Sequence, residues 1–321
     1  VAADPVLGAP PDDDQFRVSI AGAKEKTARV RVNGQWCRPH GAAPTTHILK
    51  LPLGLIGNMR ADMSDSVENE WLCAQIVKEL GLPVAGTEMA TFGGQKVLVV
   101  ERFDRAWMDG GQWIARLPQE DFCQATATPP DAKYEKDGGP GIGKVLSLLS
   151  GSESPDLDRM RFLLAQFAFW LMAATDGHAK NFSVFLRRGD AYALTPLYDV
   201  ISAWPVIGNG PNLISPRKAG LAMALHSKNV HYRLFEILTR HWEGLAKKSG
   251  VPQVWNEMLA MVERVNPVQA AIGSSLPAHY PKLVSTRVPE GMQAQGSTLR
   301  AGRSEFRNPQ PATAYAATRD P

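Results

Sequence analysis

The sequence predicts an α+β fold with two parts, a strand-rich N-terminal part and a mainly helical C-terminal part. Short segments in which apolar and polar residues alternate, the pattern of half-buried strands, recur between residues 16 and 104. From residue 118 onward, patterns of helical period dominate. The most apolar run of the chain, residues 162–175, then breaks into the polar loop DGHAKNF. This run predicts a buried core helix that holds the loop in place, because a membrane-crossing helix needs ~20 apolar residues.

Composition indicates an ordinary soluble globular protein. Its 321 residues, 44% hydrophobic and 21% charged, suit one large domain or two small ones. The formal net charge of +3 is too small to indicate nucleic-acid binding by itself. Cys37, Cys73 and Cys123 lie far apart, which argues against a disulfide framework or a thiolate metal site and favours a reduced cytoplasm. We find no signal peptide and no membrane-spanning segment, and we expect no membrane partner.

The first predicted strands flank a loop of small residues. QFRVSIAG, from residue 16, alternates like a half-buried strand, and ARVRVNGQW, from residue 28, resumes the alternation. The loop between them has the layout of one that covers ATP phosphates, because small residues let backbone N–H groups approach phosphate oxygens. It contains one glycine, so an ordinary hairpin is the alternative. The residues of this candidate phosphate loop are Ala21, Gly22, Ala23, Lys24, Glu25, Lys26 and Thr27.

The next strand carries a lysine. THILKLP places Lys50 in an otherwise apolar segment, and lysine is rarely buried without a partner. A kinase uses a strand lysine to contact ATP, so we expect Lys50 to do so. The alternative is a strand-end lysine whose long stem reaches solvent.

A helix with two candidate acids follows in SDSVENEWLCAQIVKELGLP, with capping residues at its start and Gly81 and Pro83 at its end. A kinase needs a helix glutamate that pairs with the strand lysine. Glu70, at the edge of the buried stripe, is the first choice, and Glu68, on the opposite flank, is the second. The alternative is that both acids only favour the helix N-terminus electrostatically.

Strands over TEMATF and QKVLVVERFDR are joined by the Gly93-Gly94 turn. The second strand ends in Glu101, Arg102 and Phe103. This is the position at which a two-lobed kinase crosses between its lobes and hydrogen-bonds adenine through backbone groups.

The DGHAKNF loop and the hairpin after it supply the chemistry. An acid, Asp176, is followed five positions later by Asn181, and a second acid, Asp199, comes one hairpin further on. In kinases this spacing belongs to the residue that positions or deprotonates the acceptor hydroxyl and to two magnesium ligands. Carboxylate and amide oxygens are hard ligands that suit Mg²⁺. Each residue alone could merely cap a helix or a turn, but the three together favour the functional interpretation.

His178 and Lys180 share that loop, and we place both among the ATP-binding residues. His178 is also expected to order the loop by hydrogen bonding a backbone group or Asp176.

Helical patterns cover the rest of the chain. We expect a short helix over QEDFCQATA, a glycine-rich loop opening a helix at KYEKDGGPGIGKVLSLLSG, an irregular segment over 201–225, and amphipathic helices over 230–250 and 251–273. GGPGIG follows no strand, so it is not a dinucleotide-binding fingerprint; we expect a surface loop near substrate. The predicted division is a flexible lead-in 1–15, a kinase N-lobe 16–104, a C-lobe 105–284 and a disordered tail 285–321.

A series of longer motifs covers most of residues 16–285, in this order: SIAGAKEKTA, THILKLP, SVENEW, VERFDR, LPQEDFCQ, KYEKDGGPGI, ATDGHAKNFSVF and LTPLYDVISA. Together they closely resemble the HipA family of bacterial serine/threonine protein kinases, the toxins of type II toxin–antitoxin modules. The resemblance implies a two-lobed, protein-kinase-like α+β fold and a cytoplasmic location in bacteria.

The resemblance also implies roles for individual residues. Asp176 resembles the catalytic aspartate, and Asn181 and Asp199 resemble the magnesium ligands. Further implied roles are the ATP-phosphate lysine at Lys50, the adenine-contacting hinge at Glu101 and Phe103, the phosphate loop at 21–27, and an autophosphorylated serine at Ser19. The resemblance implies that phosphorylation of Ser19 ejects the phosphate loop and silences the kinase; phosphate adds about −1.5 to −2 charges next to a site built for ATP phosphates. From the sequence alone, Ser19 is an outward-facing strand serine.

Implied partners are an aminoacyl-tRNA synthetase as substrate, with glutamyl-tRNA synthetase first, and a helix-turn-helix, HipB-like antitoxin dimer that binds operator DNA. The kinase would co-repress its operon, with DNA contacted mainly through the antitoxin. Typical members carry about a hundred or more residues ahead of the phosphate-loop strand, a span of normal domain size. We therefore expect a fragment, or a short form whose missing N-terminal subdomain is a separate protein.

Two other functions compete with an ATP- and Mg²⁺-dependent kinase. One is a non-catalytic kinase-fold subunit that binds an antitoxin–DNA complex. The other is a metal hydrolase using Asp176, His178 and Asp199, which the single histidine of this loop disfavours, since metal-site histidines usually cluster.

Overall fold

The computed structural model describes residues 26–57, 60–274, 276 and 280–301. Its N-terminal part is built on a five-stranded antiparallel sheet in the order β2-β1-β3-β7-β6. The strands are β1 (Lys26–Val32), β2 (Gln35–Cys37), β3 (His47–Lys50), β6 (Thr87–Phe92) and β7 (Gln95–Glu101). Because β3 is the central strand, Lys50 at its end has a neighbouring strand on each side. Ser19 and residues 21–25 lie outside the described residues.

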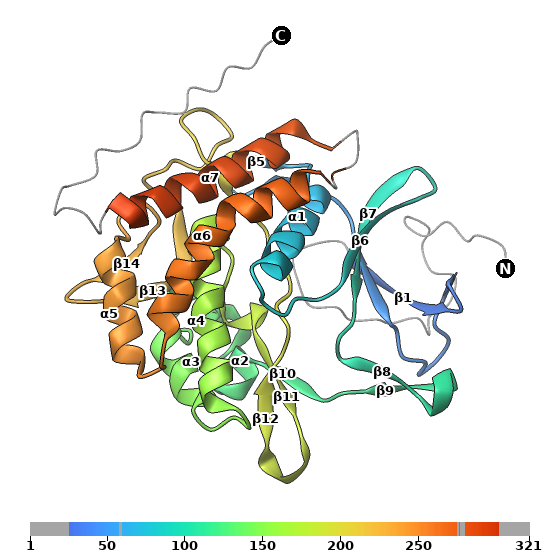
Figure 1. The fold of residues 1–321 in the computed structure, drawn as a ribbon. Coiled ribbons are helices and arrows are strands. Elements are labelled where there is room, and N and C mark those ends of the chain that lie inside the picture. Colours follow the sequence, from blue (N-terminus) through green and yellow to red (C-terminus); the bar gives the residue numbers. More distant parts are fainter. Residues whose placement is uncertain (1–25, 58–59, 275, 277–279, 302–321) are drawn as a thin grey trace.

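One helix, α1 (Ser66–Glu79), packs against β6 and β7 (Figure 1). Val67 of this helix shares an apolar cluster with Leu98 and Val100 of β7. The predicted helix therefore forms, and Gly81, with φ +86°, follows its end. A short hairpin of β4 (Gly54–Ile56) and β5 (Ala61–Met63) lies between β3 and α1 in the chain.

The C-terminal part is organised around α4 (Pro155–Met172), the predicted core helix, whose residues from Phe162 onward are all buried. Three helices pack against it: α3 (Ile142–Leu149), α6 (Val254–Gly273) and α7 (Lys282–Ala301). Its Trp170 and Phe167 meet Trp242 of α5 (Thr239–Ser249), with ring centroids 5.8 and 5.0 Å apart. Figure 1 shows α4 beneath α6 and α7, on the opposite side of the molecule from the five-stranded sheet.

Smaller elements complete the fold. Three strands, β10 (Gln119–Asp121), β11 (Ser183–Leu186) and β12 (Tyr192–Leu194), form one antiparallel sheet. The other pairs are β8 (Arg105–Met108) with β9 (Trp113–Arg116), and β13 (Gly220–His226) with β14 (Val230–Arg233). Short helices are α2 (Phe122–Ala125) and the 3₁₀ turns 109–111, 130–132, 135–137, 179–181, 188–190 and 204–206.

Between residues 119 and 239, several elements differ from those expected from the sequence. Residues 119–121 form a strand that pairs with β11, and α2 begins only after Asp121, which caps it. Residues 220–226 and 230–233 form a hairpin, where we expected irregular structure and a helix, and α5 begins only at Thr239. Five consecutive residues of β13 are buried, so this strand lacks the alternation that would reveal it in the sequence.

The expected disordered tail is wrong for residues 285–301, which belong to α7. Val284, Val288 and Met292 form its buried stripe, but the same stripe contains Gly291 and Gln295, which lower its hydropathy. Gly291 packs beneath Trp204, since a Cβ there would lie 2.3 Å from the indole ring. Residues 302–321 lie outside the described residues. Among those that are described, no helix is long and apolar enough to cross a membrane.

His241, in the first turn of α5, should make the free energy of unfolding depend on pH. His241 Nδ1 accepts the backbone N–H of Leu238 at 3.1 Å, and its ring stacks on His231 at 3.9 Å. Burial lowers the pKa of His241 from 6.5 to about 4. The unfolded chain therefore binds a proton that the folded chain does not, and the free energy of unfolding should fall as the pH falls from about 6.5 to 4. The slope should reach at most about 1.4 kcal/mol per pH unit.

Urea unfolding between about pH 7 and pH 4.5 measures this slope. In His241→Gln the side-chain oxygen can still accept the Leu238 N–H, as glutamine does in a capping box, but cannot titrate. This variant should keep stability near pH 7 and show a shallower slope. An unchanged slope would mean that other groups cause the pH dependence.

Candidate active site

The site is centred on the buried ammonium of Lys50, whose side chain is 5% exposed. Its Nζ contacts Glu70 Oε1 from α1 and Asp199 Oδ1 from the segment after β12. Burial lowers the pKa of Lys50, but the Glu70 and Asp199 carboxylates raise it well above its ordinary value, so the ammonium stays charged. A buried charge of this kind needs such partners, because an unpaired one would be very costly. The structure thus brings together three residues that the sequence assigned to one site.

Asp199 also approaches a second lysine. Lys26 lies directly opposite Lys50 on β1, and its Nζ is 3.9 Å from Asp199 Oδ2. Like charges in such a cross-strand pair destabilise a sheet, and the carboxylate between them offsets this. Lys26 and Thr27, which the sequence placed at the end of the phosphate loop, are the first two residues of strand β1.

The two candidate acids of α1 have different partners. Glu70 reaches Lys50, whereas Glu68 reaches Lys96 on β7. The backbone carbonyl of Glu68 also accepts the hydroxyl of Tyr280. Glu70, the first choice from the sequence, is thus the acid that pairs with the strand lysine.

A buried amide fastens α1 to the Asp199 segment. Asn69 Nδ2 donates to the backbone oxygen of Ser202 at 2.8 Å, and its Oδ1 accepts the Ser202 N–H at 2.9 Å. Ser202 Oγ in turn donates to the backbone oxygen of Met172, the last residue of α4. Asp199 itself has φ +56°, a left-handed backbone that few residues other than glycine adopt. The helix that carries Glu70 and the strained turn that carries Asp199 are therefore held in one position.

The DGHAKNF loop follows α4 directly. Asp176 is half exposed, and its backbone oxygen accepts the N–H of His178 at 2.8 Å and Asn181 Nδ2 at 2.7 Å. His178 Nε2 lies 3.7 Å from Asp176 Oδ1. The hydrogen bond from Asn181 to the Asp176 backbone uses the side-chain nitrogen of Asn181. Its Oδ1 has no hydrogen-bond partner within the described part of the chain. The loop thus presents one carboxylate and one amide oxygen.

The pKa of His178 lies below its ordinary value. Burial lowers the pKa of His178, the Asp176 charge raises it, Lys133 lowers it, and Asp199 raises it more weakly. Both carboxylates therefore act on one ring. Its Nδ1 is buried and has no hydrogen-bond partner among the described residues.

Lys180 points toward a different acid. Its Nζ is 2.6 Å from Asp121 Oδ2 at the end of β10, and its backbone oxygen accepts the Tyr198 hydroxyl at 2.9 Å. Tyr198 also exchanges a hydrogen bond with Ser183 at 2.6 Å. Lys180 therefore joins the loop to the small sheet beneath it.

The predicted crossing between the lobes lies at the end of β7. The N–H of Glu101 donates to Gly86 at 2.8 Å, and the N–H of Arg102 donates to Thr46 at 2.9 Å. The Phe103 ring packs 5.7 Å from Phe185 and 5.6 Å from Tyr198. The Phe103 ring at the end of this segment therefore packs on two aromatic side chains of the C-terminal part.

Sequence reasoning gave no role to Tyr134, although KYEKDGGPGI was among the motifs. Its hydroxyl donates to Asp176 Oδ1 across 42 residues of sequence. A single tyrosine in a polar loop produces no periodic pattern, so only the fold reveals this contact. The partners of Asn69 were missed for the same reason.

The residues present suit magnesium better than a histidine-rich metal centre. In the described ranges, no three His, Cys, Asp or Glu side chains lie close enough to hold a metal ion. Asn181 Oδ1 and the Asp199 carboxylate are hard oxygen ligands, and Mg²⁺ typically uses few protein ligands and keeps several waters.

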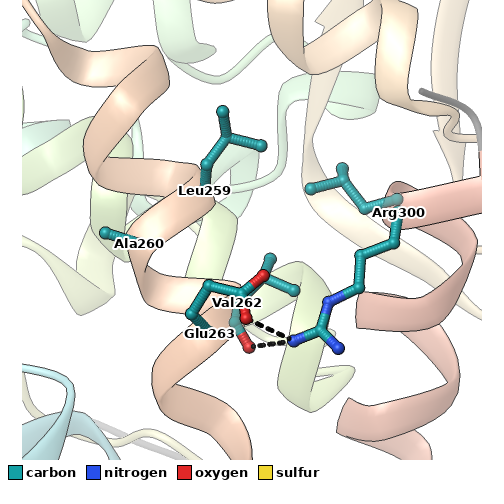
Figure 2. A pocket seen from close by; sticks show the side chains of 6 residues that line it. Leu259, Ala260, Val262, Glu263 and Arg300 are labelled. Atoms are coloured by element: carbon teal, nitrogen blue, oxygen red, sulfur yellow. Dashed lines mark hydrogen bonds and ion pairs between the residues drawn. The ribbon is translucent and has the colours of Figure 1, made fainter.

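A small hollow of about 130 Å³ lies elsewhere, between α6 and α7. Arg300 closes one side of it by donating to the backbone oxygen of Val262 and to Glu263 (Figure 2). None of its lining residues belongs to the polar cluster around Lys50, so it is not part of the candidate active site.

Comparison with known sequences identifies relatives. The model of a protein family described as HipA-like C-terminal domain matches residues 18–272. The chain is 34% identical over 239 residues to the Sinorhizobium fredii protein named "Putative kinase Y4mE", covering 74% of this chain and 52% of that protein. It is 28% identical over 201 residues to the Shewanella oneidensis serine/threonine-protein kinase toxin HipA, covering 59% and 44%. The chain spans about half the length of these curated relatives.

Comparison with solved structures confirms the two-lobed, protein-kinase-like α+β fold. A chain of the complex of Shewanella oneidensis HipA, HipB and operator DNA matches with a TM-score of 0.73, at 22% identity, over 91% of this chain and 68% of that one. The Helicobacter pylori proinflammatory kinase CtkA matches with a TM-score of 0.52, at 14% identity, over 84% and 90%.

Replacing the amide that links α1 to the Asp199 segment should destabilise the protein. Asn69→Leu keeps the side-chain volume but leaves the buried N–H and carbonyl of Ser202 unpaired, at a cost of about 1–3 kcal/mol each. Urea unfolding should show a loss of at least about 2 kcal/mol. The exposed Asn266→Leu on α6 is the matched control and should stay within about 0.5 kcal/mol of wild type. Equal stability of the two variants would show that the link contributes nothing.

Proposed function

The chain belongs to the family of HipA-like C-terminal domains, and on this premise we propose that it is a serine/threonine protein kinase that uses ATP and Mg²⁺. The observation that carries the proposal is the buried Lys50, held between Glu70 of α1 and Asp199. Kinases need a strand lysine paired with a helix glutamate and placed beside a metal-binding aspartate. That arrangement has no evident structural need, since a buried ion pair is seldom more stable than an apolar substitute.

Each residue then has a chemical task. When bound, ATP and Mg²⁺ supply the phosphoryl group and the positive charge that stabilises its transfer. We assign Asn181 Oδ1 and Asp199 to holding Mg²⁺, and Lys50 and Lys26 to neutralising phosphate oxygens. Asp176, half exposed at the open side of its loop, would orient the acceptor hydroxyl and take its proton.

We also propose which residues contact the adenine and the phosphates of ATP. We assign the adenine contact to the backbone near Glu101 and Phe103, where two aromatic side chains already pack. We propose that residues 21–27, of which Lys26 and Thr27 begin β1, form the phosphate loop, and that Ser19 is the autophosphorylation site. We place His178 and Lys180 beside the nucleotide, His178 because its Nε2 lies 3.7 Å from Asp176 Oδ1.

The biological role follows the relatives. The Shewanella oneidensis match is a toxin that forms a complex with HipB and operator DNA. We propose that this chain is likewise a growth-arresting toxin with a helix-turn-helix antitoxin partner, through which it would co-repress its operon. We further propose an aminoacyl-tRNA synthetase as its substrate, with glutamyl-tRNA synthetase the first to test.

Incubation with ATP and Mg²⁺ tests the proposed activity. The intact mass of the wild type should rise by one phosphate that maps to Ser19, provided Ser19 is unmodified at the start. Asp176→Asn should abolish the gain, because the amide cannot take the hydroxyl proton. Asp190→Asn, an exposed acid in the β11–β12 turn, is the matched control and should behave as wild type. No gain in an unmodified wild type would favour the non-catalytic binding subunit.

The two acids of α1 provide a second test. Glu70→Gln should lower kcat/KM for ATP by about tenfold or more, because Lys50 then loses one of its two carboxylate partners. Glu68→Gln removes an equal charge from the same helix, but its partner is Lys96, so it should change kcat/KM less than threefold or so. Initial rates over a range of ATP concentrations measure both. Equal losses would mean that α1 acts only through its overall charge.

A further inference from the structure

We infer that Tyr134 is the positioning residue for Asp176: its hydroxyl holds Oδ1 of that carboxylate and leaves Oδ2 to receive the acceptor hydroxyl. This inference rests on the proposed kinase activity, in which Asp176 is the group that meets the acceptor. It also gives a function to the motif KYEKDGGPGI, which the proposed function left without one.

The contacts of Asp176 divide its two oxygens. Tyr134 Oη and His178 Nε2 both approach Oδ1, the second at 3.7 Å. Oδ2 has no hydrogen-bond partner among the residues that the structure describes, and the side chain is 51% exposed. Oδ1 is therefore bonded by the protein, while Oδ2 of this half-exposed side chain is left to receive an acceptor hydroxyl.

Tyr134 is itself held against the loop that carries Asp176. Its ring packs edge-on against His178, with centroids 5.0 Å apart and planes at 85°. The ammonium groups of Lys133 and Lys136 lie 5.2 and 5.5 Å from the ring centroid, within the range of cation–π attraction. The backbone oxygen of Lys133 accepts the N–H of Ala179 at 3.2 Å. These contacts hold the Tyr134 ring against the loop that carries Asp176.

The glycines of the motif permit this support. Gly139 N–H donates to the Tyr134 carbonyl at 2.9 Å, and a Cβ on Gly139 would lie 2.3 Å from the carbonyl oxygen of Ala132. A Cβ on Gly141 would lie 2.2 Å from Glu135 Oε1. The neighbours of Gly139 are backbone atoms, so that position requires glycine. A side chain at position 141 would instead displace the Glu135 carboxylate.

Glu135 links the same turn to strand β13. Its carboxylate accepts the N–H of Ala224 on β13 at 2.6 Å and pairs with His226 at 2.6 Å. Tyr134 therefore stands on a turn that is fixed at one end to the Asp176 loop and at the other to β13.

Tyr134 acts as a donor throughout. Burial and the Asp176 charge both raise the pKa of Tyr134 above its ordinary value, so the phenol keeps its proton. As the acceptor oxygen bonds to the γ-phosphorus, the bond from that phosphorus to the bridging oxygen of ADP breaks and the acceptor proton passes to Asp176 Oδ2. Tyr134 neither gains nor loses a proton in this step.

Tyr134→Phe tests the inference, because it keeps the ring and removes the hydroxyl. We expect kcat for phosphate transfer to fall about tenfold or more, with the KM values for ATP and the protein acceptor unchanged, since a hydrogen bond to a charged group is lost. The matched control is Tyr192→Phe, which loses a hydroxyl bond to Leu148 at 2.5 Å remote from Asp176, and it should keep kcat. A kcat that falls no further than in the control overturns the inference. So does a rise in kcat, which would mean that the hydroxyl blocks the acceptor position.

A second measurement does not depend on activity. Tyr134→Phe, Asp176→Ala and the double variant form a cycle of unfolding free energies. If the hydroxyl holds the carboxylate, the two single effects should not add; additive effects would overturn the contact. Should the wild type transfer no phosphate, the proposed function fails, and this cycle still decides whether Tyr134 holds Asp176.

Discussion

The ammonium of Lys50 is the constraint on which this arrangement depends. It lies at the end of the central strand of the sheet, almost fully buried, and can be tolerated there only if carboxylates reach it. One carboxylate must come from α1 and the other from the segment after β12, in the other part of the molecule. The sheet, the helix and the C-terminal part therefore converge on a single charge. Removing one partner of such a group costs about 3–5 kcal/mol, whereas the intact cluster adds little stability by itself.

Lys50 can keep both carboxylate partners only if β3, α1 and the Asp199 segment stay at fixed positions relative to one another. Hydrogen bonds between uncharged groups hold α1 and the Asp199 segment in place. The two bonds between Asn69 and Ser202 fix α1 to the Asp199 segment, and Ser202 fixes that segment to the end of α4. The DGHAKNF loop begins within a few residues of the same helix end. Asp199 and Asp176 are thus both positioned relative to α4, whose residues from Phe162 onward are all buried. The buried helix α4 therefore sets the positions of the Asp176 and Asp199 side chains.

The sequence could predict what depends on local pattern. The helix–loop–hairpin around Asp176, Asn181 and Asp199 follows from short-range spacing, and Lys50 and Glu70 follow from a strand and a helix with clear periods. Contacts between distant segments leave no such pattern. Tyr134 meets Asp176 across 42 residues, and Asn69 meets Ser202 across 133, through single polar atoms. Strand β13 and helix α7 were missed because their local patterns are atypical. Five consecutive residues of β13 are buried, and α7 buries glycine and glutamine.

The glycine-rich segment after Tyr134 shows that glycines with the same sequence pattern can allow close approach to different partners. Glycines that let a backbone approach a phosphate and glycines that let it approach a carboxylate look alike in sequence, because both remove a Cβ from a crowded place. The absence of a preceding strand argued against a nucleotide-binding fingerprint in GGPGIG. The structure supplies the alternative partner, the Glu135 carboxylate against Gly141, and that carboxylate reaches β13. These glycines therefore affect the site indirectly: they shape the turn from which the Tyr134 hydroxyl contacts Asp176.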